Sequence, residues 1–298
     1  MSVLVEALFS EYGIHLAILI GIYLILAQSL NLTLGLGQLF NLAHVASYAI
    51  GAYTTALLST EAECSFALCI TASILLSGLF SILLGAIALR LSNDYFAIGT
   101  LAFSAIVSAL LINWKSLTHG VLGISGIPRP ELLGIDLYSN GNFLMLLSVF
   151  VIVVMLLFYL VVRSPFGRAL RALAEYDHAA LSLGINTRSL RNTAFLFSSS
   201  GAGLGGSFFA YYLNYIDPSS FSLNEMVFVL TIVIVGKPGS FWGVILASVF
   251  LVILPEPLRF IEIDSSILGP MRQLLYALIL FGIVWWKRKT IFPEQREV

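Results

Sequence analysis

The sequence predicts an all-α fold, a polytopic membrane helical bundle of eight or nine transmembrane segments that forms one domain over residues 1–298. Of the 298 residues, 59% are hydrophobic and 10% are charged, and the mean hydropathy is +0.97. Soluble domains carry about 25% charged residues. Apolar runs near the length of about 20 residues that a membrane crossing needs recur along the chain. Because a backbone in lipid must satisfy its own hydrogen bonds, these runs predict helices.

The first predicted span follows directly on the N-terminal segment. Residues 1–13 contain Glu6 and Glu11 but no Lys or Arg, so we expect no signal peptide there. The remaining spans follow from the same pattern of apolar runs between polar, Gly or Pro residues. The nine candidates are 14–34, 38–59, 66–90, 95–113, 143–162, 192–213, 223–236, 240–258 and 267–286. The seventh is too short for a full crossing, so we expect a broken or re-entrant segment there.

The Lys and Arg residues predict the orientation of the bundle. They gather in the segment 163–191, at Arg90 and after the last span, and nine crossings place all three positions on one side. Such residues mark the cytoplasmic side. We therefore expect the N-terminus and the loop 114–142 outside the cell and the C-terminus in the cytoplasm. The net charge of −1 gives no basic surface for nucleic acid.

Glycine interrupts two of the hydrophobic stretches. Gly35 and Gly37 separate the first two spans, and Gly236-Lys237-Pro238-Gly239 separates the seventh and eighth. Breaks at corresponding places in two halves of a chain are typical of a transporter core. Tight turns between helices would also require these residues.

Several motifs of enzymes and nucleotide-binding proteins are absent. The sequence has no ATP phosphate-binding loop and no zinc-type spacing of His and Cys, so we expect no catalytic residue, metal or cofactor in this chain. Residues 201–206 fit G-x-G-x-x-G but lie inside a predicted span. Ser199, Gly203 and Ser207 recur there every four residues, which indicates close helix packing in lipid.

Polar residues inside or beside the spans are candidates for a substrate pathway. Asn41, His44 and Tyr48 fall at i, i+3 and i+7 of the second predicted span, so we expect them to share one helical face. Polar groups in the hydrocarbon region usually face a cavity or the bundle interior. Hydrogen bonding between helices, or capping of a helix end, would explain each of them as well. The complete candidate set is Asn31, Asn41, His44, Tyr48, Asp94 and Glu225.

The segment 163–191 has the pattern of an amphipathic surface helix. Ser164-Pro165 is a typical helix start, and Gly184 is a typical helix end. Between them Ala and Leu alternate with charged residues, as in helices that dock into a groove of another protein. A basic loop that only fixes the topology is the alternative.

Several stretches of the sequence resemble the permease subunits of branched-chain amino-acid ABC importers, of the LivH/LivM type. The resemblance covers about 20–290. It rests on the order of these stretches: residues 31–37, 41–44, 51–54, 94–103, 123–128, 164–174, 183–186, 217–221 and 239–243.

This resemblance implies a subunit that provides the translocation pathway of an ATP-driven importer in a bacterial inner membrane. The implied partners are a homologous second permease subunit, two ATPase subunits that bind ATP and Mg, an external solute-binding protein and membrane lipid. The implied substrates are branched-chain or other neutral amino acids, while relatives that carry urea or amides leave that choice open.

In such importers a cytoplasmic coupling helix of the permease fits a groove on the ATPase, often around the pattern E-A-A-x-x-x-G. Here Ala179, Ala180 and Gly184 match that spacing, and His178 stands where the glutamate would be. The resemblance therefore implies an ATPase-coupling set of Arg168, Arg171, Glu175, Asp177, His178, Ala179, Ala180 and Gly184.

Two other classes of membrane protein fit an all-helical chain. A secondary transporter would need an ion-coupling carboxylate deep in the membrane, and Glu225, near a span edge, is the one candidate. A membrane enzyme would need His, Asp or Glu residues clustered at one depth. The four histidines are scattered between the predicted sides, at His15, His44, His119 and His178.

Overall fold

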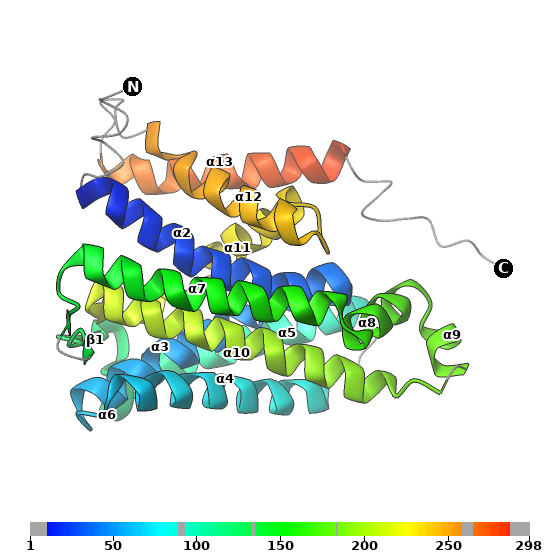
Figure 1. Ribbon diagram of the computed structural model, residues 1–298, viewed down its shortest axis with the longest axis horizontal. Coiled ribbons are helices and arrows are strands. Elements are labelled where there is room, and N and C mark those ends of the chain that lie inside the picture. Colours follow the sequence, from blue (N-terminus) through cyan, green and yellow to red (C-terminus); the bar gives the residue numbers. More distant parts are fainter. Residues whose placement is uncertain (1–10, 89–92, 133–134, 183, 258–264, 287–298) are drawn as a thin grey trace.

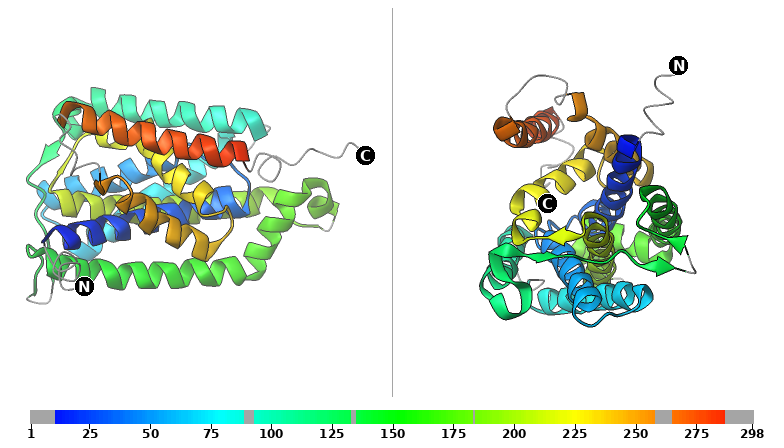
Figure 2. Two further views of the ribbon diagram at one scale, coloured as in Figure 1. Left: turned by 90° about the horizontal axis from the view of Figure 1, so that it is seen from above. Right: turned by 90° about the vertical axis from the view of Figure 1, so that its left-hand side faces the viewer.

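The computed structural model describes residues 11–88, 93–132, 135–182, 184–257 and 265–286. Its long helices run beside one another along the longest axis of the molecule (Figure 1). One end of the bundle carries strand β1 (Ile124–Ser125) and the short helix α6 (Lys115–Thr118), and we name it the β1 end. The opposite end carries helices α8 (Pro165–Glu175) and α9 (Asp177–Ser182), and we name it the α8 end. Figure 2 looks onto the β1 end in its right-hand view.

The described helices confirm the predicted all-α membrane bundle. Four of them are long and apolar enough to cross a membrane: α2 with its continuation η1, α4, α5 and α7. The helices of the bundle are α2 (Glu11–Leu30), η1 (Asn31–Leu36), α3 (His44–Thr60), α4 (Phe66–Ala88), α5 (Asn93–Asn113), α7 (Asn140–Arg163), α10 (Thr187–Leu213), α11 (Leu223–Val235), α12 (Phe241–Ile253) and α13 (Ser265–Trp286).

The centre of the bundle is a close packing of α10 against α3 and α4. A side-chain carbon at Gly51 of α3 would run into the backbone of Gly203 in α10, so the two helices touch main chain to main chain. Hydroxyl groups join the same helices: Thr55 lies 2.7 Å from Ser73 and 2.5 Å from Ser207. This contact confirms that the glycine-rich stretch 201–206 serves helix packing.

The second predicted span is helical over a shorter range than expected. α2 ends in the π-helix η1, and residues 38–41 lie outside any helix before α3 begins at His44. Asn41 is therefore not on α3, and the expectation that it shares a helical face with His44 and Tyr48 was wrong. The Asn41 side chain instead accepts a hydrogen bond from the amide of Ala43 at 3.1 Å, in a turn that leads into α3.

The connection between α5 and α7 is folded onto the β1 end. It contains α6 (Lys115–Thr118), the 3₁₀ helix η2 (Gly120–Leu122), β1 (Ile124–Ser125) and the two-stranded pair β2 (Glu131–Leu132) and β3 (Ile135–Asp136). β1 pairs antiparallel with β4 (Tyr215–Ile216), which directly follows α10. The Asn214 side-chain amide also donates to the Ile127 carbonyl at 2.7 Å, so this loop is fastened to the end of α10.

Helices α11 and α12 form a hairpin beside α2 and α13, as both views of Figure 2 show. Each has 13 residues, or about 20 Å, which is shorter than the hydrocarbon core of about 30 Å. The expected shortness of the seventh segment therefore extends to the eighth. The 3₁₀ helix η3 (Pro218–Phe221) leads into α11 from the β1 end.

Candidate functional site

The two glycine breaks of the sequence meet in the structure. The amide of Gly239, at the tip of the α11–α12 hairpin, donates to the Asn31 carboxamide oxygen at 2.8 Å. A side-chain carbon at Gly35 would run into the Gly239 nitrogen and the Asn31 carboxamide. On the turn before, the Gln28 side chain donates to the Phe241 carbonyl at 2.7 Å. η1 and the hairpin tip therefore form one tightly packed junction.

Helix α8 (Pro165–Glu175) contacts this junction from the α8 end. Its start is as predicted: the Ser164 side chain accepts from the Gly167 amide at 3.2 Å, and Pro165 occupies the first turn. Leu170 is fully buried, and a side-chain carbon at Gly37 would lie 3.4 Å from it. The charged residues that were assigned to the coupling set on this helix point outward, since Arg168, Arg171 and Glu175 are all exposed.

Helix α9 (Asp177–Ser182) continues the same connection after a bend at Tyr176. Ala180 is only 2% exposed and belongs to the core, whereas Tyr176 is 74% exposed and Leu181 is 51% exposed. Gly184 has a φ of +76°, as a helix-ending glycine does. The side chains of Asp177, His178 and Ala179 lie outside the described part of the chain. The apolar pattern of the segment included Leu181 but not Tyr176, and neither residue was assigned to the coupling set.

His44 lies where three helices meet. Its Nε2 is 3.2 Å from both the Ser29 hydroxyl and the Leu26 carbonyl of α2, and its Nδ1 is 3.3 Å from the Ser198 hydroxyl of α10. Its side chain is buried, and these contacts join α3 to α2 and α10.

Two other pathway candidates are buried with an unsatisfied polar atom. Within the described residues, the Asn41 side-chain nitrogen and the Tyr48 hydroxyl have no hydrogen-bond partner. The Tyr48 ring packs on Phe221 of η3 with the ring centroids 5.0 Å apart. Asp94 lies in the first turn of α5, and its side chain is outside the described part.

Glu225 lines a cavity of about 340 Å³ between the ends of α11, α12 and α13. Tyr23 of α2 lies beside its carboxylate. Arg272 of α13 also lines this cavity, and sequence reasoning missed it. A single Arg inside the predicted span 267–286 was the available signal, because a charge in the membrane rarely lacks a function.

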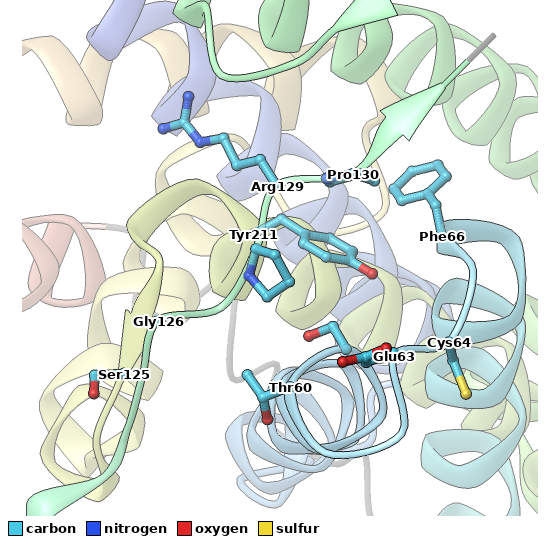
Figure 3. A pocket seen from close by; sticks show the side chains of 11 residues that line it. Thr60, Glu63, Cys64, Phe66, Ser125, Gly126, Arg129, Pro130 and Tyr211 are labelled. Atoms are coloured by element: carbon cyan, nitrogen blue, oxygen red, sulfur yellow. The ribbon is translucent and has the colours of Figure 1, made fainter. Parts of the chain in front are cut away.

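A second cavity, of about 440 Å³, opens at the β1 end between α3, α4 and the loop before α7. In Figure 3 the Tyr211 ring reaches into it, while the Arg129 guanidinium points away. Arg129 donates to the Tyr138 carbonyl at 2.9 Å, to the Asn140 side chain at 3.0 Å and to the Tyr212 carbonyl at 2.9 Å. Burial lowers the pKa of Arg129, and the residue serves to hold this loop on α7 and α10.

Within the described residues no three His, Cys, Asp or Glu side chains are placed to hold a metal ion. The geometry is therefore a helical bundle with a short apolar hairpin, a polar cavity and an amphipathic helix at one end. The sequence profile of the permease component of branched-chain amino acid transport systems matches residues 13–284. The chain belongs to this permease family.

Relatives agree with the family assignment over most of the chain. The high-affinity branched-chain amino acid transport system permease protein LivM of Escherichia coli K12 is 37% identical over 96% of this chain and 71% of its own length. The LivM protein of Salmonella typhimurium has the same identity and coverage. A probable branched-chain amino acid transport permease protein LivM of Methanocaldococcus jannaschii is 27% identical over 75% of this chain and 68% of its own length.

The comparison with solved structures found no match. The resemblance stated from the sequence is confirmed, and the chain is a multi-pass transport subunit of an ABC importer family rather than an enzyme.

Proposed function

We propose that this chain provides the translocation pathway for branched-chain or other neutral amino acids in an ATP-driven importer of a bacterial inner membrane. A homologous second permease subunit completes the pathway. Two partner ATPase subunits bind ATP and Mg, and an extracytoplasmic binding protein delivers the amino acid. The family and the names of the relatives support the substrate class.

The charge distribution supports an α8 end in the cytoplasm. Arg163 ends α7, Arg168 and Arg171 lie on α8, and Arg188 and Arg191 lie in the first turns of α10. Lys and Arg concentrate on the cytoplasmic side of membrane proteins. In this orientation the described N-terminal helix starts outside the cell, α13 ends in the cytoplasm, and the β1 end faces the binding protein. Arg90 and the C-terminal Lys and Arg residues lie outside the described part.

The observation that carries the proposal is the contact chain from α8 through η1 to the hairpin. α8 packs on η1 through Leu170, and η1 holds the hairpin tip through Asn31 and Gly239. A packed junction of this kind moves as a rigid unit rather than deforming continuously. An ATPase that shifts α8 therefore shifts the hairpin, whose far ends border the cavity at Glu225. This links ATP-driven closure of the partners to the pathway.

Co-purification and transport test the proposal together. The tagged chain, extracted from its native membrane, is expected to bring down two ATPase chains and a second multi-span protein. The same complex in proteoliposomes, supplied with its binding protein, is expected to take up labelled leucine only with internal ATP. A chain that purifies alone, or uptake that continues without ATP, would overturn the importer assignment.

A further inference from the structure

The cavity at Glu225 combines groups of opposite charge in a small space. Its volume of about 340 Å³ is at the lower end of the range for ligand pockets, about 300 to 1,000 Å³. It is formed by segments that are far apart in the sequence: the end of η3, the first turns of α11, the middle of α2, the end of α12 and the first half of α13. It is therefore a feature of the folded bundle and not of one loop.

The charged groups in this cavity are incompletely satisfied. Within the described residues the Oε1 atom of Glu225 and the Nε atom of Arg272 are inaccessible and have no hydrogen-bond partner. Glu225, Arg272, Glu256 and Tyr276 all line this one cavity. The side chains of Glu225 and Arg272 are only partly buried, so a charged ligand inside the cavity can pair with the polar atoms that they present there.

One side of the cavity wall is aromatic and apolar, while Ser219, Ser220, Ser222, Asn224 and Gln273 add uncharged polar groups to the lining. The Tyr23 and Phe228 rings meet edge to face with centroids 4.8 Å apart, and the Phe228 and Tyr276 rings are 4.4 Å apart. Leu19 and Val252 complete this side. A ligand with a positive group, a negative group and a small hydrocarbon part would match the two charges and the apolar side.

We propose that this cavity is a binding site for a free neutral α-amino acid, with Arg272 pairing with its carboxylate and Glu225 with its ammonium group. The inference rests on the proposed function and adds the recognition site to it. Tyr23, which lies beside Glu225, orients the carboxylate. The aromatic wall receives the hydrocarbon side chain and sets its size limit.

Ligands that lack one charge test each pairing separately. The probe is labelled leucine bound to the complete complex in lipid nanodiscs, without the binding protein. Leucine amide keeps the ammonium group but has no carboxylate, and 4-methylpentanoate keeps the carboxylate but has no ammonium group. Arg272→Gln is expected to weaken leucine binding by about tenfold or more, because a charge-assisted hydrogen bond is lost, and to leave leucine amide nearly unaffected. Glu225→Gln should weaken leucine equally and spare 4-methylpentanoate.

A structural role for the two charges predicts a different result. Loss of packing alone would weaken all three ligands by the same factor, and that outcome, or unchanged leucine binding in both variants, overturns the proposal. Glu61→Gln, at an exposed acid that caps the end of α3, is the matched control and is expected to bind leucine normally. Arg272→Lys keeps the positive charge and should retain part of the affinity.

The same set of variants separates this inference from the proposed function. Suppose that the wild-type complex imports leucine with ATP and that the two cavity variants import it at the same rate as wild type. That result would contradict the proposed binding site and leave the proposed importer function supported. If wild-type complex shows no ATP-dependent import of any neutral amino acid, the proposed function fails first.

Discussion

The amide nitrogen of Gly239 lies 2.8 Å from the side-chain oxygen of Asn31, a residue that precedes it by 208 positions in the sequence. This hydrogen bond joins the tip of a short helical hairpin to the π-helical end of α2. It ties together the two places where glycine interrupts the hydrophobic pattern of the sequence. Since polar contacts inside the bilayer have no water to replace them, the geometry at this point is closely constrained.

Gly35→Ala should destabilise the protein, because the added methyl group would overlap the Gly239 amide and the Asn31 side chain. Overpacking of this kind costs about 1 to 3 kcal/mol. The measurement is the thermal unfolding midpoint of the purified complex. Gly282→Ala in α13 is the matched control, since its added carbon meets no atom within 4 Å. Equal midpoints for the two variants would show that the junction is looser than described.

His44→Leu should lower stability without changing recognition of the amino acid. The substitution removes the contacts of the ring with Ser29 and Ser198, and such contacts between membrane helices contribute about 0.6 kcal/mol on average and up to about 1.7 kcal/mol. We expect a lower unfolding midpoint and an unchanged KM for leucine uptake. His119→Asn, at an exposed loop residue with a φ of 59°, is the control. A raised KM with an unchanged midpoint would place His44 in the pathway instead.

Leu181→Arg should release the ATPase subunits from an otherwise folded permease, because Leu181 is exposed at the end that we assign to the cytoplasm. Ala180→Arg should instead disrupt α9 itself, since Ala180 is buried. The readouts are the yield of co-purified ATPase and the elution profile of the permease. Val121→Arg, at an exposed apolar residue of the β1 end, should leave both unchanged. Full ATPase recovery with Leu181→Arg would mean that α9 does not form the contact.

Asp217 should stabilise the β1 end at neutral pH but not in acid. Burial acts to raise the pKa of Asp217, but hydrogen bonds from Ser219, Ser220 and the Ser220 amide outweigh it and lower the pKa. Ionised Asp217 therefore contributes to the free energy of unfolding at any pH above the ordinary Asp pKa of about 4. This contribution is lost as the pH falls through the lower pKa that Asp217 has in the folded protein.

Asp217→Ala is expected to lower the unfolding midpoint at pH 7, since replacement of a good N-cap residue by Ala costs about 1 kcal/mol. The difference from wild type should stay constant between about pH 5 and 8 and shrink below about pH 4. The measurement is the midpoint of both proteins across this range. A difference that grows on acidification would contradict the assignment of a lowered pKa.

Most of the fold could be predicted because hydropathy and length act locally. The span 66–90 corresponds to α4 at Phe66–Ala88, and the span 143–162 lies within α7. The path of the first residues of the predicted span 38–59 could not be predicted this way. Residues 38–43 are as apolar as a helix start, and only the contact of Leu39 and Ala43 with Leu84, Phe96 and Phe195 explains their buried, non-helical path.

The candidate site was predictable in type but not in arrangement. Glu225 was recognisable as an acid at a span edge, and the Ser164-Pro165 start of α8 as a helix boundary. That Arg272 joins Glu225 depends on how α13 packs against α11, which no local pattern encodes. The burial of Ala180 and the exposure of Leu181 likewise depend on the angle at which α9 leaves α8 at Tyr176.

The packing of α10 between α3 and α4 has a consequence for biosynthesis. Ser47 of α3 meets Ser199 of α10 across 152 residues of sequence. At translation rates of about 5 to 20 residues per second, Ser47 is synthesised roughly 8 to 30 seconds before Ser199. During that interval the face of α3 that carries Ser47 and Gly51 has only α4 and lipid to cover it. Until α10 is present, the serine and threonine hydroxyls of α3 can donate hydrogen bonds to carbonyls of their own helix. The chain therefore reaches its final packing only after the ribosome has inserted more than two thirds of it, and a truncation before α10 should leave α3 and α4 as substrates for membrane proteases.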